Sequence, residues 1–257
     1  GCAALAEKVA GSADKAVELM NSRAKMLGMN DTVYTDCTGM GEGNVTTAKD
    51  TALLCSELAK YKNLTPYLTC WLDTVRDGKA ELVNLNRLVR TYKGVTGMKA
   101  WGSEKAGSCI AATAEKGDMS VCVVLNGCDS QEDMNAEAKK LLNLAFDTYE
   151  IYTPELPEDM VKETVVCGGE ELSVELAPEG LYPIVIPRGT YRMVECDFTA
   201  EEKLDAPVKN GETAGEIRYT MGGEVILEGK IVACKEVKKM NFICGIKKLV
   251  YNLLSMQ

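Results

Sequence analysis

The sequence predicts an α+β protein built from several parts, and three observations support this prediction. Helix-like and strand-like patterns of apolar residues alternate across residues 1–152. Short strand patterns separated by close turns fill residues 158–237, which is typical of an all-β domain. The last segment, residues 238–257, places its apolar residues on one face of a helix.

The composition is that of a globular protein with room for two domains, since 46% of its 257 residues are hydrophobic and 26% are charged. A net charge of −9 and a pI near 4.8 argue against nucleic acid as a partner, because phosphates require a basic face. No stretch approaches the roughly 20 apolar residues of a transmembrane helix. Gly1 opens directly into a helical pattern, so no cleavable signal peptide is expected here.

Cysteine and histidine usage restricts the chemistry. The chain has 11 cysteines and no histidine, so an odd thiol remains after any pairing. No C-x-x-C pair occurs, and we therefore expect no metal and no cofactor. Cys55, Cys109, Cys122 and Cys234 lie in apolar runs and are interpreted as buried free thiols. Without histidine, acyl transfer would need lysine as the base.

The first domain opens with helical patterns. A short apolar helix is expected over Cys2–Val9, and Ser12 can cap a second helix that ends at a glycine. Thr46 or Thr47 opens a third helix with one apolar side. Later in the domain, Glu132–Glu150 has the period of a long amphipathic helix that should lie on a small sheet.

Strand patterns lie between the third helix and the long one. Tyr67–Val75 and Ala80–Leu85 flank an Asp-Gly turn and predict a hairpin. Next comes Gly94–Gly107, G-V-T-G-M-K-A-W-G-S-E-K-A-G, followed by two apolar runs, Ser108–Ala114 and Ser120–Leu125. A lysine at the end of a Gly-bounded strand, followed by small and hydroxyl residues and a return strand, can present a cation and backbone N–H groups to an anionic ligand.

The second domain follows a change in composition, where Pro154 and Pro157 bracket acidic residues and mark a linker. Its short strand patterns predict a small β-sandwich without a catalytic constellation. They are Lys162–Val166, Glu171–Glu175, Tyr182–Pro187, Tyr191–Phe198, Gly215–Met221 and Val225–Cys234.

The C-terminal segment predicts a basic amphipathic helix lying at a membrane surface. From Lys230 onward there are six lysines against one glutamate, inside an otherwise acidic protein. The alternative is a helix docked on its own protein or on another copy. The residues expected to contact the membrane are Ile246, Lys247, Lys248, Leu249, Val250, Leu253 and Leu254.

The stretch Gly94–Gly107 resembles the third active-site motif of the low-molecular-weight penicillin-binding proteins, the serine D-alanyl-D-alanine carboxypeptidases. The runs Ala3–Ser12, Met20–Met29 and Thr46–Leu54 are similar to that family in the same order. The resemblance covers essentially the whole chain. It implies a partial β-lactamase/transpeptidase-like α/β domain followed by an all-β stalk.

The resemblance also implies a function and a location. Family members remove terminal D-alanine from peptidoglycan stem peptides through a serine acyl-enzyme, and β-lactams bind the same site. They lie on the outer face of the cytoplasmic membrane, so an export signal would lie outside this chain.

Family chemistry needs a Ser-x-x-Lys, a Ser-x-Asn and a Lys-Thr-Gly motif. By resemblance the first two precede the first helix and lie outside this chain. Three formal matches, Ser12–Lys15, Ser22–Lys25 and Tyr61–Asn63, are interpreted as chance. The catalytic residues are therefore expected to be absent here.

The third motif departs from the family pattern. Lys99 is present, but Ala100 and Trp101 stand where the family has threonine and glycine. Gly102 would occupy the oxyanion position and Ser103 the later hydroxyl. These five residues form the predicted substrate-binding site.

Two hypotheses follow. The first is a carboxypeptidase-like protein that is inactive in this chain alone. The second, favoured by Ala100 and Trp101, is a non-catalytic, membrane-associated module that binds the cell wall or acts as a scaffold. Because the resemblance leaves the sheet incomplete, we also expect self-association through its open edge or local repacking.

Overall fold

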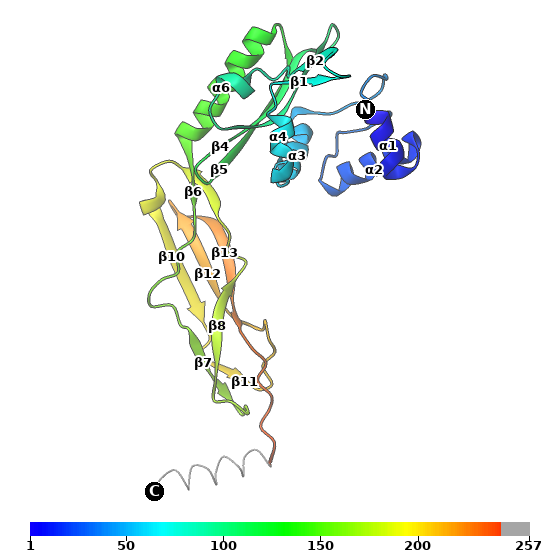
Figure 1. The fold of residues 1–257 in the computed structure, drawn as a ribbon. Helices are drawn as coiled ribbons and strands as arrows, with labels where there is room; N and C mark the ends of the chain where they lie inside the picture. Colours follow the sequence, from blue (N-terminus) through cyan, green and yellow to red (C-terminus); the bar gives the residue numbers. More distant parts are fainter. Residues whose placement is uncertain (243–257) are drawn as a thin grey trace. The chain divides into compact units, whose positions relative to one another are not determined.

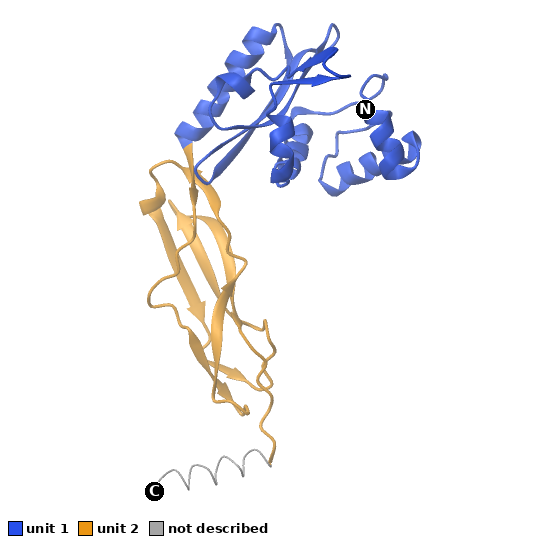
Figure 2. Cartoon of the chain, in the orientation of Figure 1, with its two compact units in different colours: residues 1–148 blue, residues 149–257 orange. Residues whose placement is uncertain are grey.

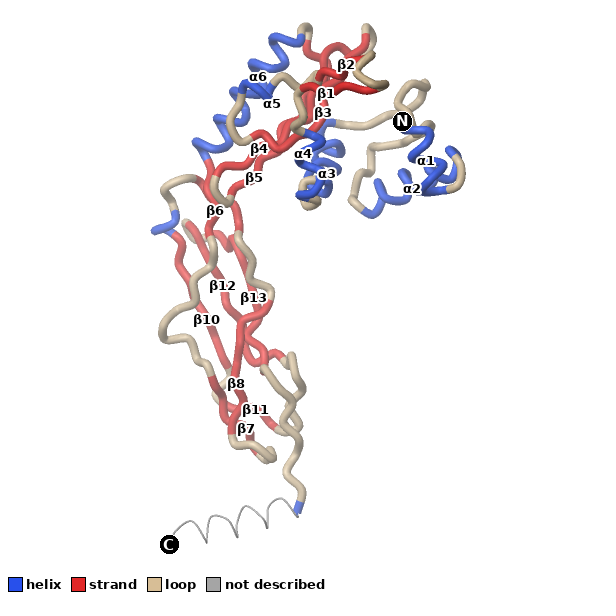
Figure 3. Tube along the Cα trace, viewed as in Figure 1, coloured by secondary structure: helices blue, strands red, loops and turns tan. Residues whose placement is uncertain are grey.

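The computed structural model describes residues 1–242 and divides the chain into two compact units, Gly1–Thr148 and Tyr149–Gln257 (Figure 2). The predicted membrane-contact residues, 246 to 254, lie outside the described residues. Within residues 1–242 no helix is both long and apolar enough to cross a bilayer. Helices belong mainly to the first unit and strands dominate the second (Figure 3).

The first unit begins with three helices, α1 (Cys2–Ala10), α2 (Ala13–Met26) and α3 (Ala48–Leu58), as the sequence predicted. Two of them have side-chain caps. Ser12 Oγ accepts the Lys15 amide at 3.2 Å, and Thr47 Oγ1 accepts the Asp50 amide at 3.1 Å.

A buried carboxylate fixes the loop between α2 and α3. Asp50 is 2% exposed and accepts the Asp31 amide at 2.9 Å and the Thr32 hydroxyl at 2.7 Å. Further along the loop, the hydroxyl and amide of Thr38 lower the pKa of Asp36 to about 2. Both carboxylates therefore accept hydrogen bonds from loop residues that do not belong to a β-sheet, and so fix the loop conformation.

A three-stranded antiparallel sheet forms the centre of the first unit. It consists of β3 (Val95–Ser103), β4 (Gly107–Lys116) and β5 (Met119–Cys128), in that spatial order. Helix α6 (Gln131–Thr148) packs on β4 and β5, and α3 packs on the same two strands. Figure 1 shows α6 and α3 on opposite faces of this sheet. The long helix was predicted on a sheet, and this prediction is confirmed.

The face of α6 toward the sheet carries the buried residues Met134, Ala138, Leu142 and Phe146, spaced by four. On the other face, Cys55 of α3 forms a cluster with Met98 and Ala111. The small residues of β4, including Ala111, let helices approach the sheet from both sides.

The segment before β1 departs from the prediction. Tyr67–Val75 was expected to be a strand, but the chain forms a 3₁₀ turn, Lys62–Leu64, and the short helix α4 (Thr65–Leu68). Pro66 sits in the first turn of α4, where a missing N–H costs nothing. The predicted hairpin is formed by shorter strands, β1 (Leu72–Val75) and β2 (Ala80–Val83). A short helix, α5 (Leu88–Thr91), then precedes β3.

The second unit is all-β, as predicted. A two-stranded sheet pairs β6 (Tyr149–Tyr152) with β9 (Ile184–Pro187), so β6 belongs to this unit. The other strands form one sheet with the order β10-β12-β13-β8-β7-β11. They are β7 (Glu163–Cys167), β8 (Ser173–Glu179), β10 (Val194–Ala200), β11 (Lys203–Asp205), β12 (Thr213–Met221) and β13 (Glu224–Ala233), with a 3₁₀ turn at Tyr191–Met193 before β10.

The core of the second unit includes Val174, Ile217, Tyr219 and Ile231, none of which is exposed. Tyr219 donates its hydroxyl to the Glu155 carbonyl at 2.9 Å. The buried phenol is therefore satisfied, and the segment after β6 is fixed to the core.

Candidate functional site

Strand β3 lies at the edge of its sheet. Its neighbour on one side is β4, with Lys99 opposite Ala111 and Ala100 opposite Ile110, and among residues 1–242 no strand pairs with its other side. Alternate N–H and C=O groups of an edge strand point away from the sheet. This edge can therefore pair with an extended peptide through the backbone.

The predicted site residues lie on this strand, but they differ in exposure. Lys99, Gly102 and Ser103 are exposed, whereas Ala100 is 3% exposed and Trp101 is half-buried. Lys99 and Trp101 share one face of β3 because strand side chains alternate, and Ala100 lies on the opposite face. Within residues 1–242 the Lys99 ammonium forms no ion pair, so its charge is available to a ligand.

The packing of the Trp101 side chain explains how a large residue fits at this position of the motif. The ring packs against the cluster of Cys55, Met98 and Ala111. Part of the ring is thus buried against this cluster, at a position where the resemblance implies glycine. Its remaining exposed part lies on the same face of the strand as Lys99.

Polar side chains hold the beginning of β3. Asn86 is fully buried, donates Nδ2 to the Gly97 carbonyl at 3.2 Å and accepts the Leu88 amide on Oδ1 at 3.1 Å. Asn84 donates to the Leu68 carbonyl at 3.1 Å. Asn86 thus fixes the strand two residues before Lys99, while Asn84 holds the end of α4. Neither asparagine was assigned a role from the sequence, although the Asn-x-Asn run that precedes the motif is a usable signal.

The other end of β3 turns tightly into β4. Ser103 Oγ accepts the Ala106 amide at 3.0 Å, so this hydroxyl closes the hairpin. Gly107 has φ of 66°, and a Cβ there would lie 2.9 Å from the Cys128 carbonyl oxygen. Glycine is therefore required at this turn. Gly102 is exposed, with its Cβ position 3.1 Å from the Gly107 carbonyl oxygen.

The three formal matches to the other motifs are not brought to this strand as a catalytic pair. Ser12 caps α2, Ser22 and Lys25 are exposed on α2, and Tyr61 is 50% exposed. Among the side-chain hydrogen bonds of residues 1–242, none joins a serine Oγ to a lysine Nζ. The described part of the chain thus shows an exposed lysine on an edge strand, without a serine–lysine pair beside it.

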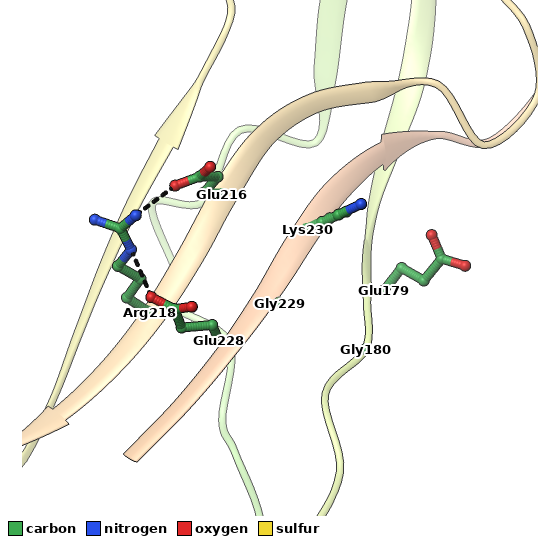
Figure 4. Close-up of a pocket in the computed structure, with 7 residues that line it drawn as sticks. All are labelled: Glu179, Gly180, Glu216, Arg218, Glu228, Gly229 and Lys230. Carbon is green, nitrogen blue, oxygen red and sulfur yellow. Dashed lines mark hydrogen bonds and ion pairs between the residues drawn. The ribbon is translucent and has the colours of Figure 1, made fainter. Parts of the chain in front are cut away.

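A concave region also lies on the sheet of the second unit, and its volume is near 510 Å³. Figure 4 shows the Arg218 guanidinium between Glu216 and Glu228, at 2.8 and 3.1 Å. Its other lining residues are Glu179, Gly180, Gly229 and Lys230. Glu216 and Glu228 both pair with Arg218, on the adjacent strands β12 and β13. We therefore interpret this group as cross-strand ion pairs on the sheet surface rather than as a ligand site. No metal-binding cluster occurs in the described residues either.

Comparison with known proteins agrees with the fold. Residues 1–129 match the family profile of D-alanyl-D-alanine carboxypeptidase, and residues 146–239 match that of the penicillin-binding protein 5 C-terminal domain. The chain belongs to the D-alanyl-D-alanine carboxypeptidase family. The resemblance read from the sequence is thereby confirmed.

Individual relatives cover nearly the whole chain. It is 32% identical over 250 residues to D-alanyl-D-alanine carboxypeptidase DacF of Bacillus subtilis, covering 95% of this chain and 64% of DacF. It is 30% identical over 244 residues to DacC of Escherichia coli, covering 94% and 61%. The chain thus spans slightly less than two thirds of these relatives.

Solved structures share the fold. Penicillin-binding protein 5 of Haemophilus influenzae superposes with a TM-score of 0.78 at 24% identity, covering 92% of this chain and 70% of that one. Penicillin-binding protein D2 of Listeria monocytogenes, in its cefotaxime-bound form, has a TM-score of 0.52 at 27% identity, covering 56% and 60%.

Proposed function

We propose that the protein is a D-alanyl-D-alanine carboxypeptidase-like protein of peptidoglycan metabolism, whose family removes terminal D-alanine from stem peptides through a serine acyl-enzyme. We further propose that this chain in isolation is inactive, because its described residues present no serine–lysine pair. In this proposal β3 binds the peptide and Lys99 binds its terminal carboxylate. The observation that carries it is that Lys99 is exposed, forms no ion pair among residues 1–242, and lies on an edge strand within the family-matched residues 1–129. Peptidoglycan lies outside the cytoplasm, and we infer the same compartment for this protein.

The chemistry of binding divides between backbone and side chain. An extended peptide adds to β3 as a further strand, and its terminal carboxylate reaches the Lys99 ammonium. Gly102 leaves the backbone accessible at the position proposed for the oxyanion N–H. Ala100 supplies no hydroxyl, so the carboxylate keeps the lysine but lacks the second donor of the family motif.

The first test measures binding of an acylated peptide ending in D-alanyl-D-alanine, as the free acid and as the C-terminal amide, by calorimetry. We expect Lys99→Gln to weaken binding of the acid by roughly 10- to 100-fold, the range of a charge-assisted hydrogen bond, and to leave the amide unchanged. Lys79→Gln, in the β1–β2 turn, is the matched control and should bind like the parent chain.

Two further measurements complete this test. Fluorescent penicillin should leave the 257-residue chain without covalent label, because its described residues present no serine–lysine pair, while DacF serves as the labelled control. A serine adduct on this chain would contradict the proposal of inactivity in isolation. Equal affinity for acid and amide would contradict the role of Lys99. Size-exclusion chromatography before each titration measures the self-association that we propose for the open edge of β3.

We also propose that residues 246–254 attach the protein to the outer face of the cytoplasmic membrane. The support is their pattern of apolar and lysine residues. Vesicles containing anionic lipid should co-sediment with the full chain, and a chain with Lys247→Glu and Lys248→Glu should stay in the supernatant. The double variant Lys238→Glu and Lys239→Glu is a control for charge alone. An equal loss of co-sedimentation in the two double variants would contradict an anchor formed by residues 246–254.

A further inference from the structure

Two cysteines that are distant in sequence meet on one face of the first unit. Cys55 lies on α3 and Cys122 on β5, which pack against each other. Both belong to the apolar cluster that also contains Ala111, with Cys55 5% exposed and Cys122 half-buried. Cys122 packs against the buried cluster of which Cys55 is a member. The two thiols are thus brought together by the packing of helix α3 on strand β5.

One of the two sulfurs is reachable from solvent. A cavity of about 380 Å³ between α3 and the sheet is lined by Cys122, Ser56 and Ser120, with Lys60 and Lys62 at its edge. Each lysine is paired, Lys60 with Glu57 at 2.6 Å and Lys62 with Glu115. A small reagent can therefore reach Cys122, while Cys55 lies deeper behind it.

The close approach of the two thiols also makes their pKa values unequal. The contact with Cys122 lowers the pKa of Cys55 below its usual value, against the opposing effect of burial. The same contact, together with burial, raises the pKa of Cys122. Loss of one proton from the pair is therefore easier at Cys55 than at Cys122. A thiolate is the nucleophile of thiol–disulfide exchange.

We propose that Cys55 and Cys122 are a modification site, forming a reversible disulfide that fastens α3 to β5 when the protein meets a low-molecular-weight disulfide. A thiolate of the pair attacks one sulfur of the reagent, forming a mixed disulfide and releasing one reagent thiolate. The second cysteine then attacks the protein sulfur of that mixed disulfide and releases the second reagent thiolate. Two protein thiols are oxidised, one reagent disulfide is reduced to two thiols, and both protons pass to the released thiolates.

The disulfide would close a long loop between two elements of the same unit. Such cross-links stabilise mainly by restricting the unfolded chain. We expect oxidation to raise the thermal midpoint of the first unit by on the order of 10 °C. Trp101 packs on the same cluster, so its fluorescence can report the change.

The experiment treats the reduced full chain with excess oxidised glutathione, blocks free thiols, and maps peptides without reduction. Trypsin with chymotrypsin separates Cys122 from Cys128, because Leu125 lies between them. We expect a linked peptide joining Cys55 to Cys122 that disappears on adding dithiothreitol. Cys128→Ser should keep both the link and the shift in thermal midpoint. Cys55→Ser should lose both.

Three results would overturn the proposal. They are a stable glutathione adduct on Cys122 beside a free Cys55, a link from either cysteine to a different partner, and two unmodified thiols under conditions that modify the exposed Cys167 and Cys234. The sequence predicted Cys234 to be buried, and that prediction is wrong, because its side chain lies at the surface after β13. The mapping on the parent chain decides among these outcomes even if Cys55→Ser folds poorly.

Discussion

Replacing Leu142 with alanine should lower the free energy of unfolding of the first unit by about 3–5 kcal/mol, the range for a fully buried leucine. Leu142 is not exposed at all and lies in the buried stripe of α6, which packs on β4 and β5. Truncation leaves a cavity between a helix and two strands that are already in contact with α3 on their other face. The site has little freedom to collapse, so the cost should fall in the upper part of that range.

The same helix offers a matched control. Leu144 is 59% exposed, and Leu144→Ala should change the free energy of unfolding by no more than about 0.5 kcal/mol. Both tryptophans, Trp71 and Trp101, lie in the first unit, so tryptophan fluorescence during urea unfolding reports that unit alone. Similar losses in the two variants would contradict the packing described for α6.

Gly215→Ala should destabilise the second unit by about 3 kcal/mol, the upper end of the usual cost of overpacking. Gly215 is opposite Ala200 in the pairing of β12 with β10. A Cβ at this position would lie 2.0 Å from the Thr199 carbonyl oxygen and 2.9 Å from the Ala200 Cα. These are backbone atoms, so relief requires the two strands to separate and gives up their hydrogen bonds.

Gly211→Ala separates crowding from backbone strain. Gly211 has φ of 78°, but a Cβ there would meet nothing within 4 Å, so its replacement should cost only about 1–2 kcal/mol. Hydrogen exchange followed by mass spectrometry would compare protection of β10 and β12 in the two variants. Tryptophan fluorescence should show an unchanged first unit in both. If β10 keeps its protection from hydrogen exchange in Gly215→Ala, the pairing of β10 with β12 does not depend on the close approach of Gly215 to the Thr199 and Ala200 backbone.

Local patterns were sufficient to predict much of the fold. The period of Glu132–Glu150 identified α6, and the glycine-bounded run Gly94–Gly107 identified β3 and its return strand. The strand predicted over Tyr67–Val75 was wrong in its first half, because Pro66 favours the first turn of helix α4 in front of it.

The candidate site was predictable in part. Lys99, Gly102 and Ser103 were assigned from the family resemblance, and all three are exposed; their role in binding stays a prediction. The buried bond from Asn86 to Gly97 and the meeting of Cys55 with Cys122 could not be predicted, because each depends on packing between distant segments. The partial burial of Trp101 against the cluster of Cys55, Met98 and Ala111 is of the same kind, since a strand pattern shows alternation but not what covers each face.

The burial of Ala100 bears on which terminal residues this protein can accept. A lysine is a compact point charge on a flexible stem, and the backbone of an edge strand offers the same groups to any extended partner. In the binding mode that we propose, a strand with no hydroxyl at position 100 should distinguish an acid from an amide yet discriminate poorly among C-terminal side chains. Selectivity for D-alanine would in that case come from other parts of the protein that surround the ligand.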